Sequence, residues 1–156
     1  MKRFILALVI LYGLASCSSD DNTSKERSEL LGKWIPQTAY VNVLGADMEE
    51  SYPHRINCEK DFLDIEDTKT TFAFHSDNCQ ENKFTDSYKH SKNKISLNLL
   101  GTKVELEVLS NTDNSLRLKG TGEDFKSLIP VLFPDYAQML PIGILPMVNV
   151  ELVLTK

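Results

Sequence analysis

The stretch "KISLNLLGTKVELEVL", Lys94 to Leu109, alternates apolar and polar residues with a period of two. Such alternation is typical of β-strands that have one dry face and one wet face. Ile95 and Leu97 would share one face of the first strand, and Val104 and Leu106 would share one face of the second. The cluster "LGTK" between them is of the kind that reverses a chain. This stretch therefore predicts two strands joined by a turn.

The same period continues along most of the chain, with turn-forming clusters near residues 67, 92 and 112. Consecutive antiparallel strands favour a closed barrel, because closure leaves no exposed sheet edge. The predicted fold is all-β, an eight-stranded antiparallel up-and-down barrel with a short helical or loop insertion before the last strand. The eight strands are predicted near residues 33–43, 60–66, 69–75, 83–90, 94–99, 102–109, 114–119 and 147–155.

The insertion runs from Thr121 to Met147 and is too long for a hairpin turn and too apolar for an ordinary loop. Thr121 followed by Asp124 resembles a capping box, which predicts a short helix that ends at Pro130. The apolar residues Phe125, Leu128, Ile129 and Leu132 have helical spacing. A second helical piece is predicted from Pro134 to Leu140.

The apolar side chains of this insertion need to be covered, and three arrangements would cover them. The insertion could plug the barrel mouth, line an internal cavity for an apolar ligand, or present a docking patch to a protein or a membrane. An eight-stranded barrel is either just filled by side chains or able to hold one small ligand, so all three stay open. For a cavity, the candidate ligand-binding residues are Phe72, Phe74, Phe84 and Tyr88 from the strands, and Leu132, Phe133, Tyr136 and Met139 from the insertion.

The N-terminal residues have the three-part layout of a secretory signal: the cationic "MKR", the apolar "FILALVILYGL" and the small-residue exit "ASC". The apolar block from Phe4 to Leu14 is about half of the roughly 20 residues that a transmembrane helix needs. We therefore expect residues 1–16 to be a signal peptide. Residues 17–29 are polar and are expected to form a flexible tether, and residues 30–156 the barrel domain.

The exit "LASC" resembles the lipobox of bacterial lipoproteins, which implies that Cys17 is acylated and becomes the first residue of the mature chain. Two or three acyl chains would hold the protein on a membrane almost permanently. The following "SSDDN" resembles the export signal of Bacteroidetes-type lipoproteins. The expected location is the outer membrane, with the domain exposed at the cell surface; a periplasm-facing location is the alternative.

The charge balance argues against nucleic acid as a partner. Removal of residues 1–16 takes away Lys2 and Arg3, so the formal net charge falls from -5 to -7, with 22 acidic against 15 basic residues. Nucleic acid is therefore not an expected partner. The remaining chain of about 140 residues is long enough for one domain with one core.

Cys58 and Cys79 are expected to form a disulfide, because an exported chain folds in an oxidising compartment and Cys17 is assigned to the lipid. The bridge would flank the open end of a hairpin and contribute roughly 3 kcal/mol on the chain-entropy estimate. The alternative is a metal site that includes the three histidines, His54, His75 and His90. Their spacing matches no zinc pattern, so no metal site and no cofactor are expected.

The motif "LLGKW", with Gly32 and Trp34 opening the first strand, resembles the Gly-x-Trp motif of lipocalin and calycin barrels. The order of features, from lipobox through "GKW" and "CEKDFL" to the alternating strands, resembles the lipocalin-like domains of Bacteroidetes lipoproteins. This resemblance implies that Trp34 closes one end of the barrel and that a basic side chain from a late strand lies across the indole. Arg117 and Lys156 are the two candidates.

No catalytic motif is found in the sequence, so an enzyme is not expected. The leading hypothesis, implied by the resemblance, is a membrane-anchored lipoprotein whose barrel binds a small hydrophobic or amphipathic ligand. The alternative is a protein-interaction module of a cell-envelope complex with a filled barrel.

Overall fold

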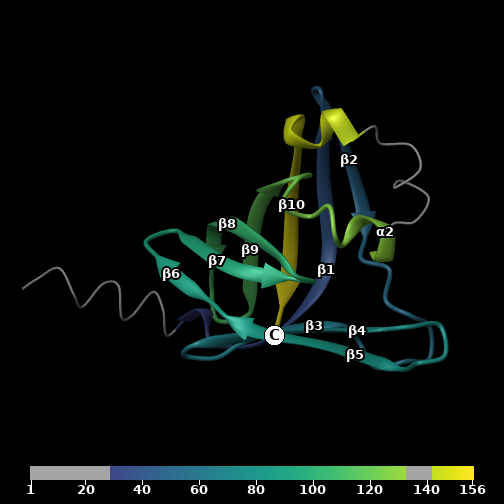
Figure 1. The fold of residues 1–156 in the computed structure, drawn as a ribbon, viewed down its shortest axis with the longest axis vertical. Helices are drawn as coiled ribbons and strands as arrows, with labels where there is room; N and C mark the ends of the chain where they lie inside the picture. Colours follow the sequence, from purple (N-terminus) through teal and green to yellow (C-terminus); the bar gives the residue numbers. More distant parts are fainter. Residues whose placement is uncertain (1–28, 133–141) are drawn as a thin grey trace, which may run out of the picture.

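The computed structural model describes residues 29–132 and 142–156, and these residues form a nearly closed antiparallel β-barrel (Figure 1). No helix in these two ranges is long and apolar enough to cross a membrane. Their strands are β1 (Gly32–Val43), β2 (Ala46–Ser51), β3 (Phe62–Ile65), β4 (Lys69–His75), β5 (Glu81–Ser87), β6 (Lys89–Ser91), β7 (Lys94–Leu99), β8 (Thr102–Asn111), β9 (Ser115–Thr121) and β10 (Val148–Thr155).

The strand order is β5-β4-β3-β1-β10-β9-β8-β7-β6, with β2 on the same edge of β1 as β3. β2 and β3 are thus two halves of one interrupted strand. β5 and β6 are likewise separated only by Tyr88, and they pair with β4 and β7 respectively. Counted in this way the ring has eight strands that follow the chain order, and the predicted up-and-down barrel is confirmed.

Two details of the strand prediction differ from the structure. The strand predicted at residues 83–90 is broken at Tyr88, and β2 was not predicted at all. The sequence of β2, "ADMEES", contains only one large apolar residue, Met48, so its alternation of apolar and polar residues is too weak to predict a strand. β2 is a strand because residues 46–51 pair with residues 38–43 of β1, which is a contact between neighbours in space.

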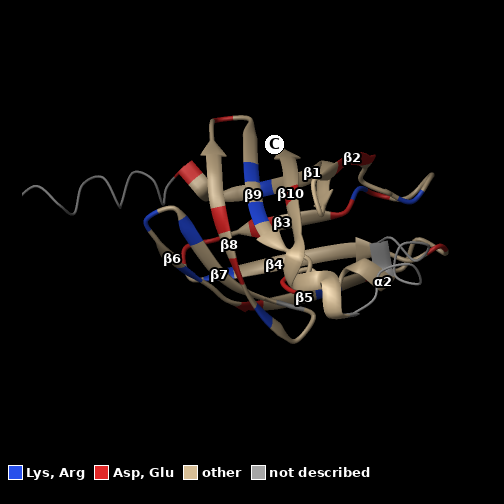
Figure 2. Ribbon diagram, turned by 90° about the horizontal axis from the view of Figure 1, so that it is seen from above, with Lys and Arg blue, Asp and Glu red and all other residues tan. Residues whose placement is uncertain are grey.

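The predicted alternation places the apolar residues of the long strands inside the barrel. The buried inward-facing side chains are Ile95, Leu97, Val104, Leu106, Leu116, Leu118 and Leu154. Lysine and glutamate occupy the opposite, wet face. β9 carries basic residues only, and the neighbouring β8 carries the glutamates (Figure 2). Lys94 of β7 and Glu105 of β8 form an ion pair on this face.

Trp34 is a member of the hydrophobic core, with 0% of its surface exposed. The indole Nε1 donates a hydrogen bond to the carbonyl oxygen of Leu30 at 2.7 Å. The ammonium group of Lys156 lies 4.4 Å from the centre of the indole ring. Gly32 leaves room for this side chain, since a Cβ at that position would lie 3.3 Å from Cε of Lys156. Arg117, the other candidate for this role, instead bonds to Glu151 on the outer face.

The described part of the insertion fills the barrel interior from one end. Phe125 and Leu128 are buried members of the core. A Cβ on Gly120 would lie 2.9 Å from the Phe125 ring, so the ring covers this glycine directly. The capping arrangement is present, with Thr121 donating to the Asp124 carboxylate from its backbone N–H and its hydroxyl. Of the three arrangements considered, residues 121–128 therefore adopt the plug.

The predicted helix boundary at Pro130 is wrong. Residues 122–128 form turns, and the short helix α2 (Ile129–Leu132) begins just before Pro130 and includes it. Proline is tolerated in a first helical turn, where its missing N–H would have no partner in any case. A 3-10 helix, η1 (Ile142–Met147), leads into β10. The second predicted piece, Pro134 to Leu140, lies outside the described residues.

Candidate functional site

The disulfide between Cys58 and Cys79 is present, as predicted. It joins the loop of residues 52–61, which separates β2 from β3, to the turn of residues 76–80 between β4 and β5. Because both sulfurs are consumed in the bridge, neither cysteine supplies a thiolate to a metal. Among the described residues, no group of three or more His, Cys, Asp and Glu side chains is arranged to hold a metal ion.

Beside this bridge lies a buried polar cluster of Tyr52, His54, Asp61 and His75. The Asp61 carboxylate accepts hydrogen bonds from the Tyr52 hydroxyl at 3.0 Å and from the His75 backbone N–H at 2.8 Å. Its Oδ1 also lies 3.1 Å from Nδ1 of His75. A carboxylate is an acceptor, so this ring nitrogen carries the proton in that contact.

The second histidine of the cluster anchors the loop to β1. Nδ1 of His54 accepts the backbone N–H of Asp61 at 3.2 Å, and Nε2 lies 2.7 Å from the carbonyl oxygen of Pro36. Nε2 therefore donates, and the His54 ring is neutral in this arrangement. Burial, together with the neighbouring Asp61 charge, raises the pKa of Tyr52 far above its usual value, so its hydroxyl stays protonated. The cluster fastens the loop at the point where β1 changes partner from β3 to β2.

Sequence reasoning missed this cluster. Tyr52, Asp61 and His75 have no common spacing in the chain, and His75 comes from a different strand. The polar run "PHRINCEKD" suggests only an exposed loop, and nothing in it reports that Asp61 is 2% exposed. The contact arises only when β4 pairs with β3 and brings His75 beside Asp61.

The predicted ligand-binding aromatic residues of the strands differ in how deeply they are buried. Phe72 and Tyr88 are buried members of the core, and Phe74 packs against that core. The Phe74 ring lies 6.0 Å from Phe72 and stacks on Phe84 at 5.9 Å. Phe84 is 40% exposed. Phe72, Phe74 and Phe84 are thus brought together from the core to the surface of the β4–β5 hairpin. The side chains of Leu132, Phe133, Tyr136 and Met139 lie outside the described structure.

A second apolar feature, which we call the inner strip, consists of Val41, Met48 and Val150. Val41 of β1 lies directly opposite Met48 of β2 on one side and Val150 of β10 on the other. Directly opposed residues of an antiparallel sheet share a face. Here it is the inner face, because Val150 belongs to the same strand face as the buried Val148 and Leu154. All three side chains are only half-buried, whereas those near Trp34 are fully buried.

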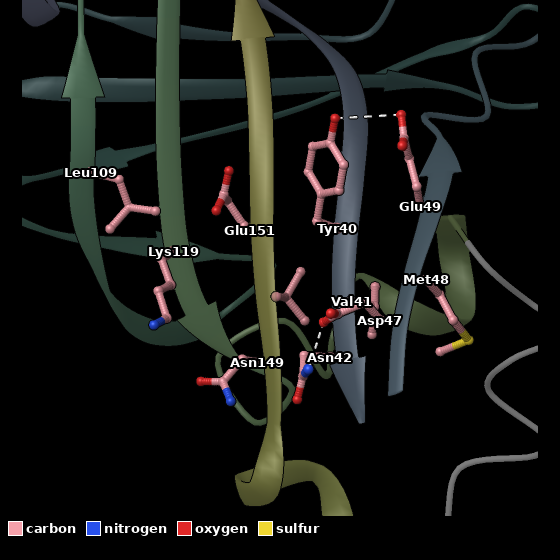
Figure 3. A pocket seen from close by; sticks show the side chains of 11 residues that line it. Tyr40, Val41, Asn42, Asp47, Met48, Glu49, Leu109, Lys119, Asn149 and Glu151 are labelled. Carbon is pink, nitrogen blue, oxygen red and sulfur yellow. Dashed lines mark hydrogen bonds between the residues drawn. The ribbon is translucent and has the colours of Figure 1, made fainter. Parts of the chain in front are cut away.

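The opposite face of these strands has a hollow of about 580 Å³, the outer hollow (Figure 3). Tyr40 and Asn42 point into it from β1, and the Tyr40 hydroxyl bonds to Glu49 of β2 (Figure 3). Leu109, 42% exposed, is one of its apolar lining residues. The hollow is lined by Tyr40, Asn42, Asp47, Glu49, Leu109, Lys119, Asn149 and Glu151, together with the three residues of the inner strip, Val41, Met48 and Val150, which lie between them along the same strands.

No protein-family model matches this chain, and no curated protein is similar to it at a significant level. One solved structure is similar. It is a crystal structure of a lipocalin-like protein from Bacteroides uniformis, 17% identical, with a TM-score of 0.46. The match covers 58% of this chain and 88% of the other. The overlap is partial, and the strand pairing of this chain defines its barrel independently of that likeness.

Proposed function

We propose that this chain is a lipid-anchored binding protein whose barrel takes up a small hydrophobic or amphipathic molecule. The observation that carries the proposal is the inner strip. Val41, Met48 and Val150 face the barrel interior and are only half-buried among the described residues. Half-buried apolar side chains on a concave inner surface are the usual lining of a site for an apolar group. Phe84, 40% exposed at the outer end of the aromatic series, is a further exposed apolar side chain.

The proposed location follows from the N-terminal residues. The lipobox-like "LASC" would place two or three acyl chains on Cys17, and "SSDDN" supports export to the cell surface. We propose a binding role without catalysis. In the described residues, the buried acid–imidazole pair of Asp61 and His75 is hydrogen-bonded to the Tyr52 hydroxyl and to a backbone N–H, and it holds a loop in place.

Native mass spectrometry of residues 18–156 would test ligand uptake. The core, the strand pairing and the disulfide described above all lie within residues 29–156, so this form retains the whole barrel. We expect a co-purified small molecule in the wild-type protein. Met48→Asp, which adds a charge to the inner strip, should remove the bound mass. Ser51→Asp adds the same charge to the outward-facing side of the same strand and should retain it. Equal occupancy in both variants would contradict the inner strip as the site.

A second candidate function is docking of another cell-envelope protein, and the outer hollow favours it. The hollow combines an exposed leucine, Leu109, with the exposed ring of Tyr40 and several charged groups. Leu109→Asp should then abolish capture of a partner from solubilised envelopes without changing any bound small molecule. Retained capture by this variant would exclude the outer hollow as the docking surface.

A further inference from the structure

β5 lies at one end of the strand order and pairs along its whole length with β4, on one side. It is the outermost of the three strands β3, β4 and β5, which run side by side (Figure 1). In residues 29–132 and 142–156 no strand pairs with its other edge, because the chain that follows pairs with β7 as β6. Every residue of β5 is exposed except Asn82, which is half-buried. A free, exposed strand edge is a template for pairing with another strand.

The β4–β5 ladder decides which backbone groups lie at this free edge. The Gln80 carbonyl accepts the Ser76 N–H, and the Tyr88 N–H donates to the Thr68 carbonyl. The register has no shift along β5, and hydrogen-bonded pairs alternate with non-bonded pairs in an antiparallel ladder. Even-numbered residues of β5 therefore bond to β4, whereas odd-numbered residues direct their N–H and C=O to the free edge. The odd-numbered residues are Glu81, Lys83, Thr85 and Ser87.

One end of the free edge is already capped, because the Ser87 N–H donates to the Asp86 carboxylate at 2.6 Å. The charged side chains nearby do not cover the remainder. Lys83 pairs with Glu81 at 2.7 Å, and its ammonium group lies 5.9 Å from the centre of the Phe62 ring of β3. Strand side chains stand roughly perpendicular to the sheet, so these charges lie over a sheet face and not across the edge. The backbone groups of residues 81, 83 and 85 are therefore accessible in the described structure.

A second copy of β5 fits this edge in an antiparallel register centred on Phe84. The odd-numbered residues of the two copies then form the hydrogen-bonded pairs, with Lys83 of each copy facing Thr85 of the other. Phe84 faces Phe84, and Asn82 faces Asp86, which sets an amide donor opposite a carboxylate. In this register all seven residues of β5 overlap, and no like charges face each other.

The neighbouring registers are less complementary. A shift of two residues toward the start of the strand places Lys83 opposite Lys83, and like charges directly opposed are unfavourable. A shift of two residues the other way makes Lys83 face Ser87, whose N–H is already bonded. The register centred on Phe84 also covers an exposed ring, because Phe84 stacks on Phe74 at 5.9 Å and is still 40% exposed. Aromatic pairs across two strands stabilise a sheet.

We propose that the free edge of β5 binds a second copy of this chain, with the two β5 strands antiparallel and centred on Phe84. The two copies form a two-fold dimer whose sheet runs β3-β4-β5-β5-β4-β3. Such an interface is self-complementary, because each copy presents the same donors, acceptors and aromatic ring. Each pair of Lys83 with Thr85 exchanges two N–H···O bonds. The dimer is independent of the proposed ligand uptake by the barrel.

Sedimentation velocity of residues 18–156 over a concentration series would test the dimer. We expect the wild-type protein to associate to twice the mass of one chain. Lys83→Pro removes one edge N–H, and proline is tolerated on an edge strand where that N–H bonds to nothing within the sheet. It should weaken association about tenfold or more relative to Lys83→Ala, which loses the same side chain but retains the N–H.

Engineered cysteines would test the register. Cys58 and Cys79 are joined to each other, so a new cysteine is the only free thiol in residues 18–156. Phe84→Cys should form an intermolecular disulfide under mild oxidation, since the Cα atoms of a directly opposed, non-bonded pair lie about 4.5 Å apart, within the range that a disulfide spans. Asn82→Cys is the matched control. Its two Cα atoms would lie about 14 Å apart, so this variant should stay unlinked.

A wild-type protein that is monomeric at every concentration would overturn the inference, as would equal association of Lys83→Pro and Lys83→Ala. Equal cross-linking of Phe84→Cys and Asn82→Cys would overturn the register. Near-ultraviolet circular dichroism would verify that each variant retains the fold. If Lys83→Pro does not fold, the comparison of the two cysteine variants decides. A monomer that captures a different protein, and loses it in Lys83→Pro, would overturn the second copy as the occupant of this edge.

Discussion

Replacement of Asp61 by alanine tests whether the buried polar cluster holds the interrupted strand together. The carboxylate accepts from the Tyr52 hydroxyl, the His75 backbone N–H and the His75 ring. Asp61→Ala leaves these three donors without an acceptor in a site where Asp61 itself is 2% exposed. An unsatisfied buried donor costs ~1–3 kcal/mol, and the low end applies here because water can enter from the adjacent exposed loop. The three donors together give an expected loss of about 3 kcal/mol.

Urea unfolding would measure this loss, with the fluorescence of Trp34 as the signal. The chain has one tryptophan and it is completely buried, so unfolding changes its environment directly. Asp77→Ala is the matched control, since Asp77 pairs with Arg55 in an exposed ion pair near the same disulfide. The control should lose less than about 1 kcal/mol. If Asp61→Ala lost no more than the control, the cluster would not be what fastens the loop.

Three further outcomes are expected. Gly120→Ala should lower the unfolding free energy by ~1–3 kcal/mol, because the new methyl group would lie 2.7 Å from Cδ2 of Leu106 and 2.9 Å from the Phe125 ring; an unchanged urea midpoint would contradict this close packing around Gly120. Cys58→Ser with Cys79→Ser should cost roughly 3 kcal/mol in the same assay, and a loss below about 1 kcal/mol would show that the polar cluster holds the loop alone. Stability should fall above pH ~10, because Tyr52 ionises in the unfolded chain but stays protonated when buried, which favours the unfolded state as pH rises. Tyr52→Phe should reduce this alkaline loss in a pH series of urea midpoints.

The strand predictions are confirmed where the apolar or polar character of each residue decides which face of the sheet it occupies. In residues 94–99 and 103–108, a polar residue separates each large aliphatic residue from the next, and only one sheet face can bury them. The pairing of Cys58 with Cys79 needed only the compartment and the assignment of the third cysteine. The predictions failed at Met48 and Pro130, where the outcome depended on a neighbouring strand or on the place of a residue within a helical turn.

For the candidate site, the sequence indicated which residue types are present, and the fold decided how deeply each one is buried and what it contacts. Phe72, Phe74, Phe84 and Tyr88 are aromatic residues of strands and were predicted to line a cavity. The structure buries Phe72 and Tyr88 in the core, packs Phe74 against it and leaves Phe84 40% exposed. The Tyr88 hydroxyl could not be identified as unpaired from the sequence, because whether a buried hydroxyl has a hydrogen-bond partner depends on side chains from other strands.

The sequence alone therefore determined the all-β class, the two-residue period of the barrel wall, the disulfide and the expectation of a lipid anchor on Cys17. Those features depend on side-chain chemistry and on spacing along the chain. The tertiary structure decided where the second strand is interrupted, that Phe125 fills the barrel, and that Asp61 meets His75. These are contacts between residues far apart in sequence, and their energies depend on burial, which only the closed sheet creates.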